Sequence, residues 1–361
     1  MIPTLLYSST AMRYGSGSPD FSFFYSAGYA WLSHTKPIFI YPPTSLPFYG
    51  FFALFNIELA GSLWRITYLI TFLAAIVSLG LTLEGVRRAY FVSLAGVLFF
   101  TSYPLLIMMN LGQVDLLVAS LSVLSLAAQR AKRENASAVL LSCATLLKGP
   151  PVLLLVYFAL YRRNLRYFGR FLLATAVIVS VSLTVVPLQL YGYYLQNIIP
   201  KVSADSAAIE INQSLLKYTS AAGLNSTLVA ITGVVIYSIF AVALGSRRLR
   251  KGSASQLRDD GMFLLNVLVL LLLSPRVWPG TYVWIILPTA FFLSTLLVRD
   301  VRILYLATIC FAVFLLNSNL TQIFLQFSQA YTTLPLAIFG NIMLSITLVL
   351  TLVRPSITEA A

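Results

Sequence analysis

Long apolar segments constrain the fold of this chain more than any other feature. Only 10% of its 361 residues are charged, whereas a soluble domain carries roughly 25% charged residues. The shortage extends along the whole chain instead of marking a single anchor, so the sequence predicts an all-α polytopic membrane protein. About eleven apolar segments are visible, at approximately 62–83, 90–109, 115–129, 136–147, 149–161, 171–188, 224–245, 260–274, 281–298, 302–318 and 333–353.

Several of these segments are shorter than the hydrocarbon requires, since a crossing takes about 20 helical residues. The segments 115–129, 136–147 and 149–161 are short, and they are either steep crossings or half-spans that protein shelters from lipid. If every segment crosses, 17 of the 24 Lys and Arg residues lie on one side and 7 on the other. Basic residues concentrate in cytoplasmic loops. We therefore expect the side with 17 basic residues to be cytoplasmic. The imbalance also favours counting the three short segments as crossings.

This orientation places the long loops 1–60, 189–223 and 318–332 on the outer side of the membrane. Long polar loops on a helical scaffold commonly carry function, so we expect the binding or active face of a multi-pass cell-membrane protein there. We expect a single domain over residues 1–361, in which an outer loop region, 1–60, precedes a helical bundle, 61–361.

The N-terminus raises a separate question. The first ten residues, MIPTLLYSST, have no basic start and too short an apolar core, which predicts no cleavable signal peptide. Counting back from segment 62–83 leaves the N-terminus outside with no helix to carry it across. Either one upstream helix is missing, or the apolar stretch 44–56 inserts as a hairpin.

The composition also excludes several classes. The net charge of +13 comes from basic residues that flank apolar segments, as membrane insertion demands, so it does not indicate nucleic-acid binding. Cys143 and Cys310 lie inside apolar segments and are expected to pack without forming a disulfide or a metal pair. The single histidine, His34, cannot form a histidine-rich metal site, and with no Asp-x-Asp motif in the sequence we expect no metal or other cofactor.

Asp20 is the first candidate for chemistry, because it stands among aromatic residues in the outer loop region. Pro19-Asp20 ahead of FSFFYSAGYAWL resembles a helix start, where Asp is a good cap. The alternative is a general base that takes a proton from an acceptor hydroxyl. In that case the aromatic run Phe21, Phe23, Phe24 and Tyr25 would shield it from water.

Two further motifs carry polar groups near the membrane. In Tyr41-Pro42-Pro43 the prolines fix an extended entry into the next segment, and Tyr41 is either structural or faces a sugar ring. In LGQVD, Gln113 and Asp115 are polar groups at membrane depth, which are costly and often functional. Asp115 would equally serve as the cap of the helix that follows.

Lys148, in LLKGPP, is the most specific single candidate. It is a lone cation between two short apolar stretches, which is expensive unless it is paired. A lysine presented at a proline break suits a phosphate oxyanion. The competing interpretation is a lysine whose stem lies in the apolar region while its ammonium reaches water.

Two outer motifs follow later in the chain. NQSL begins with Asn212 and Gln213, and it also reads as a glycosylation sequon, a signal that is weak because such triplets are common. SPRVWPGTYVW offers Arg276 and Trp278, a cation among aromatic residues. That arrangement is typical of an interfacial aromatic belt or of a sugar-phosphate site, and we favour the site.

The order of these landmarks is more informative than any one of them. An outer Asp before an aromatic helix, YPP, GQ at the start of a short helix, a K-x-x-P break followed by RRNLR, NQSL and SP-x-x-W occur between about Asp20 and Pro288. In this order they resemble the C-type glycosyltransferases, and within them the polyprenyl-phosphate-mannose-dependent α-mannosyltransferases. The resemblance implies a C-type glycosyltransferase-like helical bundle, a lipid-linked sugar donor, a glycan or glycolipid acceptor, and Asp20 as the catalytic base.

The chain departs from that family in two places. A helix usually precedes the Asp loop and is absent here. The segment after SP-x-x-W commonly carries one or two histidines, where this chain has Gly280 and Thr281, which leaves the identity of the sugar and the acceptor open.

Two other classes of function compete with a transferase. A transporter or lipid-linked-sugar flippase tends to carry polar residues in mid-span and repeated halves, whereas here the polar residues collect at outer loop ends. A membrane scaffold without catalysis would have no need for Lys148.

Overall fold

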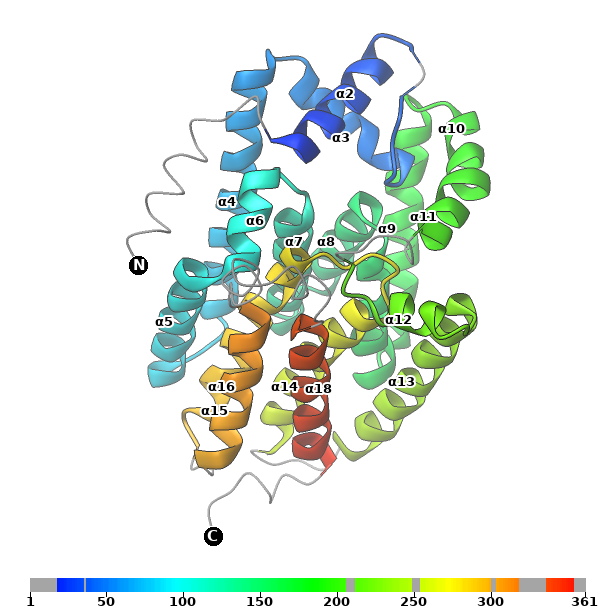
Figure 1. Ribbon diagram of the computed structural model, residues 1–361. Coiled ribbons are helices and arrows are strands. Elements are labelled where there is room, and N and C mark those ends of the chain that lie inside the picture. The colour runs from blue at the N-terminus through cyan, green and yellow to red at the C-terminus, as the bar shows by residue number, and fades with distance from the viewer. Residues whose placement is uncertain are drawn as a thin grey trace, which may run out of the picture. The chain divides into compact units, whose positions relative to one another are not determined.

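The computed structural model describes residues 18–35, 37–205, 212–248, 254–299, 303–317 and 336–353, and over these residues it contains helices and no strand (Figure 1). The predictions made for the first ten residues and for loop 318–332 lie outside the described residues. The chain divides into two compact units, each made of three separate stretches. The first unit comprises Met1–Thr82, Leu105–Val152 and Gly169–Val202, and the second comprises Leu83–Pro104, Leu153–Phe168 and Ser203–Ala361.

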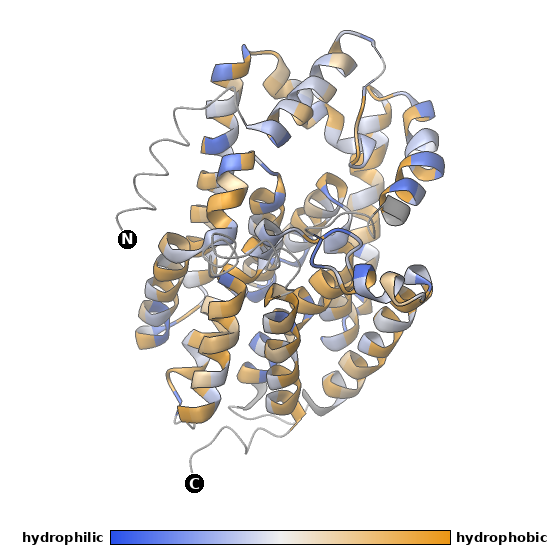
Figure 2. Cartoon of the chain, in the orientation of Figure 1, coloured by the Kyte–Doolittle hydropathy of each residue, from blue (hydrophilic) through white to orange (hydrophobic). Residues whose placement is uncertain are grey.

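The all-α, multi-pass class is confirmed, but the count of about eleven spans is not. Among the described residues five helical stretches are long and apolar enough to cross a membrane, and a sixth is found if α5 (Gly85–Thr101) and α6 (Tyr103–Leu111) together form one span. The five stretches are α4 (Ile57–Gly80), α9 (Leu165–Leu183), most of α13 (Ser226–Arg248), Pro279–Leu296, and α18 (Leu336–Val353). Figure 2 shows the apolar character of α18 and of the shorter helix α16.

Helix breaks explain the difference between segments and spans. The predicted segment 90–109 is interrupted at Ser102, whose backbone is extended, one residue before the Tyr103-Pro104 start of α6. The segment that ends near Lys148 stops because Pro150 and Pro151 cannot continue an α-helix. The chain continues there as a 3₁₀ turn, η3 (Pro150–Leu154), and a π-helical turn, η4 (Val156–Tyr161).

In the first unit a short helical hairpin precedes the bundle. Helix α2 (Pro19–Leu32) begins with Pro at its first position, where the missing N–H costs nothing. In YPP, Pro42 has an extended backbone (φ −52°, ψ 138°) and Pro43 already begins the 3₁₀ turn η2 (Pro43–Ser45), so the predicted extended entry ends at Pro42. A Cβ on Gly28 would lie 2.5 Å from the carbonyl carbon of Tyr49, so only glycine lets α2 pack this closely on α3 (Leu46–Ala53).

The rest of the first unit is a set of packed helices. Helix α4 packs on α7, and α7 packs on α8. The remaining elements are α7 (Asp115–Arg130), α8 (Glu134–Leu147), α10 (Leu188–Tyr193), η5 (Tyr194–Ile198) and α11 (Ile199–Asp205).

In the second unit α14 packs on both α15 and α18, while α15 packs on α5. The apolar side chains of α15 are almost all buried. The elements are α12 (Leu215–Ala221), α14 (Ala254–Leu273), η7 (Pro279–Ile285), α15 (Ile286–Leu296) and α16 (Ile303–Asn317), together with α5, η4, α13 and α18.

A buried ion pair holds α5 to α14 in this unit. Arg87 donates to the carboxylate of Asp260 at 2.5 Å, and the hydroxyl of Thr295 donates to the same carboxylate at 2.6 Å. Arg87 is one of the 17 basic residues that the sequence assigns to the cytoplasmic side, and its guanidinium also satisfies a carboxylate in the protein interior.

The two cysteines form no disulfide, as predicted. Cys143 is half-buried and Cys310 is exposed on α16, so the expectation that both pack inside the protein is wrong for Cys310.

Candidate functional site

Asp20 lies in the first turn of α2 but does not cap it. The N-cap residue is Ser18, and no side chain caps this helix end. The Asp20 carboxylate instead accepts a hydrogen bond from the side-chain amide of Gln113, 93 residues later in the chain. The cap interpretation of Asp20 is therefore wrong, and the carboxylate is directed to a tertiary partner.

A left-handed turn at Gly112 brings Gln113 to Asp20. Gly112 has φ +68°, and a Cβ there would lie 2.7 Å from the Cβ of Phe21. Its carbonyl accepts a hydrogen bond from the indole N–H of Trp64 at 2.8 Å. Glycine is required both by the conformation and by the space, so the GQ motif is a turn that packs on the first turn of α2.

Tyr41 fixes the direction of the Gln113 amide. Its hydroxyl donates to Gln113 Oε1 at 3.4 Å, which leaves the amide nitrogen pointing at Asp20. The loop that carries Tyr41 is itself fastened, because the hydroxyl of Thr44 donates to the carbonyl of Leu146 at 3.0 Å.

Lys148 is paired, contrary to its interpretation as a lone cation. Its Nζ lies 2.8 Å and 2.7 Å from the two carboxylate oxygens of Asp115, and it stands 5.5 Å from the centroid of the Tyr41 ring. Asp115 is 1% exposed and does not cap α7, whose N-cap residue is Val114. The proline break after Lys148 thus presents the ammonium to a buried carboxylate.

Five of the predicted site residues consequently form one connected cluster in the first unit: Asp20, Tyr41, Gln113, Asp115 and Lys148. Burial raises the pKa of Asp20 above its ordinary value, and the hydrogen bond from Gln113 opposes that shift. The charge of Asp115 raises the Asp20 pKa further and that of Lys148 lowers it. A half-buried carboxylate with a raised pKa and a fixed donor has the character of an acid–base group.

The sequence suggests that the aromatic residues after Asp20 shield its carboxylate from water. In the structure two of them, Phe21 and Phe24, pack α2 against neighbouring aromatic rings. Phe21 and Phe24 are each 2% exposed. Phe24 stacks on Tyr49 with ring centroids 5.0 Å apart, and Phe21 lies 5.7 Å from Trp64. These contacts anchor the first turn of α2 and thereby hold Asp20 in place.

The other four predicted residues, Asn212, Gln213, Arg276 and Trp278, lie in the second unit. They belong to two non-helical segments, NQSL and SPRVW, that hydrogen-bond to each other. Asn212 is buried, and its side-chain oxygen accepts from the backbone N–H groups of Ser214 and Val277 at 3.0 Å and 2.9 Å. Its amide nitrogen donates to the carbonyl of Pro275 at 2.9 Å. Asn212 therefore joins NQSL to SPRVW, which is a positioning role, and its predicted contact with a substrate stays a prediction.

Gln213 and Trp278 belong to the same pairing. The backbone N–H of Gln213 donates to the carbonyl of Val277 at 2.6 Å, and the backbone N–H of Trp278 donates to the hydroxyl of Thr281 at 3.0 Å. Thr281, at one of the two positions where the mannosyltransferases that the sequence resembles commonly carry histidine, thus helps to cap η7. Arg276 is half-buried.

One buried cation in the first unit escaped the sequence analysis. Arg65 is 7% exposed and donates to the hydroxyl of Ser18 at 2.9 Å, two residues before Asp20. The available signal was a charged residue inside an apolar span, which is costly unless it has a function or a partner.

The fold is that of a multi-pass membrane protein, and the cluster around Asp20 is its candidate acid–base site. Residues 39–275, more than half of the chain, match the family described as glycosyltransferase family 87. The chain belongs to that family and is a membrane glycosyltransferase, which decides against the transporter or flippase. Asp20, Arg276 and Trp278 lie outside the matched residues.

Other comparisons give more distant relationships. The crystal structure of ArnT from Cupriavidus metallidurans bound to undecaprenyl phosphate shares 14% identity at a TM-score of 0.45 and covers 98% of this chain and 78% of that chain. The apo structure of the same protein gives 15% identity and a TM-score of 0.44 over the same shares. None of the curated proteins compared with the chain matches it.

Proposed function

We propose that this chain transfers a hexose, mannose, from a polyprenyl-phosphate donor to an extracytoplasmic glycan or glycolipid, with inversion at the anomeric carbon. The observation that carries the proposal is the cluster in which a half-buried Asp20 is held by Gln113 and influenced by Lys148. It provides a base and a cation, the two groups that such a transfer needs.

In the proposed reaction an acceptor hydroxyl attacks the anomeric carbon and gives its proton to Asp20. The bond between the anomeric carbon and the phosphate oxygen breaks, and polyprenyl phosphate leaves with the electron pair. A single displacement of this kind converts a β-linked donor into an α-linked product. The step requires no redox partner and no nucleotide.

Lys148 would hold the charge that develops on the leaving phosphate. An ammonium has three N–H donors, and two of them face Asp115, so one is directed elsewhere. Positioned charges in a partly dehydrated site stabilise such a transition state by several kcal/mol. Asp115 would orient Lys148. Tyr41, which already bonds to Gln113, would also contact the sugar. Arg276, Trp278, Asn212 and Gln213 stay predicted substrate contacts.

The donor assay tests this function directly. Purified protein is supplied with a synthetic polyprenyl-phosphate mannose, with other polyprenyl-phosphate hexoses, or with a nucleotide-linked mannose, together with a panel of mannoside acceptors. We expect transfer from the lipid-linked mannose and an α-linkage in the product by NMR. Transfer from the nucleotide-linked sugar alone would contradict the proposed donor.

The side of the membrane is tested by single cysteines in a background that lacks Cys143 and Cys310. Ser18 is unsuitable because it is buried, whereas Ser33 and Ala131 are exposed. A cysteine at Ser33 should react with an impermeant thiol reagent in intact cells, and one at Ala131 only after permeabilisation. The reverse pattern would place the site on the cytoplasmic side.

The hydrogen bond from Gln113 predicts a shift in the pH dependence of transfer. Gln113→Met keeps the length of the side chain and removes the donor, so the pKa of Asp20 should rise, because this bond lowers it. The base is active when ionised, and the acid limb of kcat/KM should therefore move to higher pH. Tyr41→Phe, which frees the amide to rotate, should shift the limb in the same direction and by less. An unchanged acid limb in Gln113→Met would contradict the role of Gln113 as a positioning residue.

A further inference from the structure

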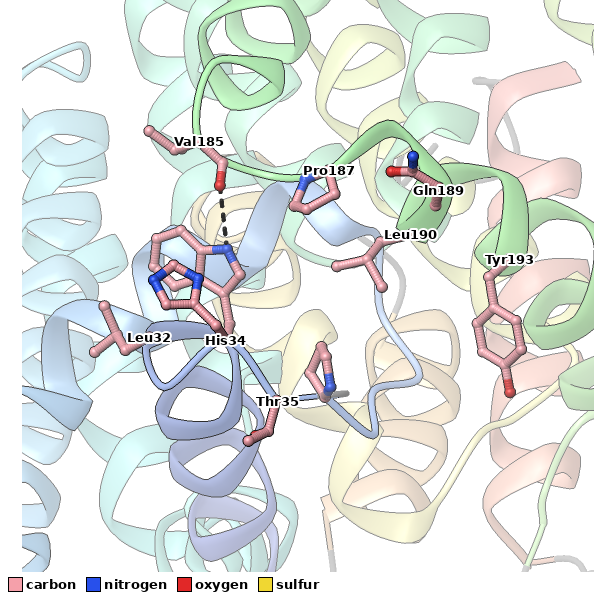
Figure 3. Close-up of a pocket in the computed structure, with 10 residues that line it drawn as sticks. Leu32, His34, Thr35, Val185, Pro187, Gln189, Leu190 and Tyr193 are labelled. Carbon is pink, nitrogen blue, oxygen red and sulfur yellow. Dashed lines mark hydrogen bonds between the residues drawn. The ribbon is translucent and has the colours of Figure 1, made fainter.

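A groove in the first unit lies at the opposite end of α2 from Asp20. It has a volume of about 880 Å³ and includes Trp31, His34 and Thr35 on one side and Gln189, Leu190 and Tyr193 on the other (Figure 3). Trp31 lies in the last turn of α2, His34 and Thr35 follow the end of that helix, and the second set belongs to α10. None of these residues belongs to the cluster around Asp20.

The walls of the groove are fixed by the backbone. The indole N–H of Trp31 donates to the carbonyl of Val185 at 3.3 Å, as Figure 3 shows. His34 has φ +54°, the left-handed conformation that often ends a helix, and the N–H of Thr35 donates to the carbonyl of Ala30 at 2.8 Å. Below the groove, Trp31 and Leu190 pack on a buried cluster that includes Phe39 and Val186.

The chemistry of the walls favours a neutral, amphipathic ligand. Among the lining residues that the structure describes there is no Asp, Glu, Lys or Arg, so none of these residues offers a lysine or arginine to a phosphate. Tyr193 combines an apolar ring with a hydroxyl, and Trp31 presents an apolar ring whose N–H donates to Val185. His34, Thr35 and Gln189 add hydrogen-bonding side chains. A sugar ring has apolar C–H faces and a rim of hydroxyls, and aromatic rings mixed with neutral hydrogen-bonding groups suit both.

The position of the groove sets the size of that ligand. Asp20 and Trp31 are at opposite ends of the same helix, α2, and at 1.5 Å per residue the eleven steps between them span roughly 16 Å. A single sugar next to Asp20 does not extend over that length, whereas a chain of several sugars does.

We propose that this groove binds the remote sugars of an extended neutral glycan acceptor, several residues away from the hydroxyl that Asp20 activates. The inference rests on the proposed function for the identity of the glycan as acceptor. The enzyme would then elongate an existing oligosaccharide. The length of α2 would set the distance between the acceptor hydroxyl and the sugars bound in the groove.

The test compares two acceptors that share the same terminal mannoside, one a monosaccharide glycoside and one an oligosaccharide. Trp31→Ala alone is ambiguous, because Trp31 also packs on Gly50. Tyr193→Ala and Gln189→Ala change exposed side chains. His34→Gly removes the imidazole without straining the backbone, because glycine readily adopts the positive φ found at this position. Each should lower the preference in kcat/KM for the oligosaccharide by up to about tenfold, the usual scale for a central aromatic contact.

Two variants outside the groove serve as matched controls. Tyr29 is 58% exposed on α2 and Gln196 is exposed in η5, and neither lines the groove. Tyr29→Ala and Gln196→Ala should keep the wild-type preference. A preference that is unchanged in all three groove variants, or a rise in the KM of the lipid donor in place of the acceptor, would overturn the proposal.

A binding measurement separates this proposal from the proposed function. Saturation-transfer NMR with the oligosaccharide and the Asp20→Asn protein needs no turnover, and Tyr193→Ala in that background should weaken the signal. If the wild-type protein transfers no sugar but the oligosaccharide still binds through Tyr193, the assigned reaction fails and the groove remains. If transfer proceeds and no binding through Tyr193 is detected, the groove proposal fails alone.

Discussion

Asp20→Asn should fold normally and lose about 10²-fold or more of its transfer rate, on the usual scale for a general base. Asn preserves the size of the side chain, and its oxygen accepts the hydrogen bond that Gln113 donates to Asp20. The substitution removes only the ability to take a proton. Initial rates with lipid-phosphate mannose, together with a thermal unfolding scan, measure the two effects separately.

The structure also sharpens the control for this prediction. Because Ser18 and not Asp20 occupies the N-cap position of α2, Asp20→Ala should cost little helix stability and should be as inactive as Asp20→Asn. A helix cap would behave differently, with Asn nearly normal and Ala unstable. An active Asn variant would remove Asp20 from the proposed mechanism.

The second large effect concerns Lys148 and Asp115. Lys148→Met removes the cation that faces the buried Asp115 carboxylate, and breaking a buried pair in this way costs about 3–5 kcal/mol of stability. We expect poor folding and loss of transfer. The single variant therefore does not distinguish a structural ion pair from a contact with the donor phosphate.

The double variant Asp115→Asn, Lys148→Met makes that distinction. With both charges gone the interior is neutral again, and replacement of a buried pair by uncharged groups is often tolerated, so folding should recover. If Lys148 holds the leaving phosphate, transfer should remain at least about 10²-fold below wild type, as when one group that stabilises transition-state charge is removed. Recovery of both folding and transfer would assign the pair to structure alone.

The sequence singled out the residues of this cluster but not the contacts between them. Gln113 and Lys148 stood out because a polar or charged group at membrane depth is costly unless it has a partner or a function. Their partners lie 93 and 33 residues away, and no local pattern specifies such pairings. For the same reason the sequence left Asp115 open between a helix cap and a site residue, and it did not single out Arg65.

What the sequence determined by itself is local in origin. Apolar composition requires a membrane-embedded chain, the absence of water inside the bilayer requires helices, and the prolines near Lys148 and in YPP interrupt them. The tertiary structure decided which breaks face one another. The left-handed Gly112 turn packs against Phe21, and the end of α8 is fastened to the YPP loop through Thr44. These contacts bring the Asp20 carboxylate, its Gln113 donor and the Asp115–Lys148 ion pair together from three separate segments, so that polar groups costly in an apolar interior satisfy one another.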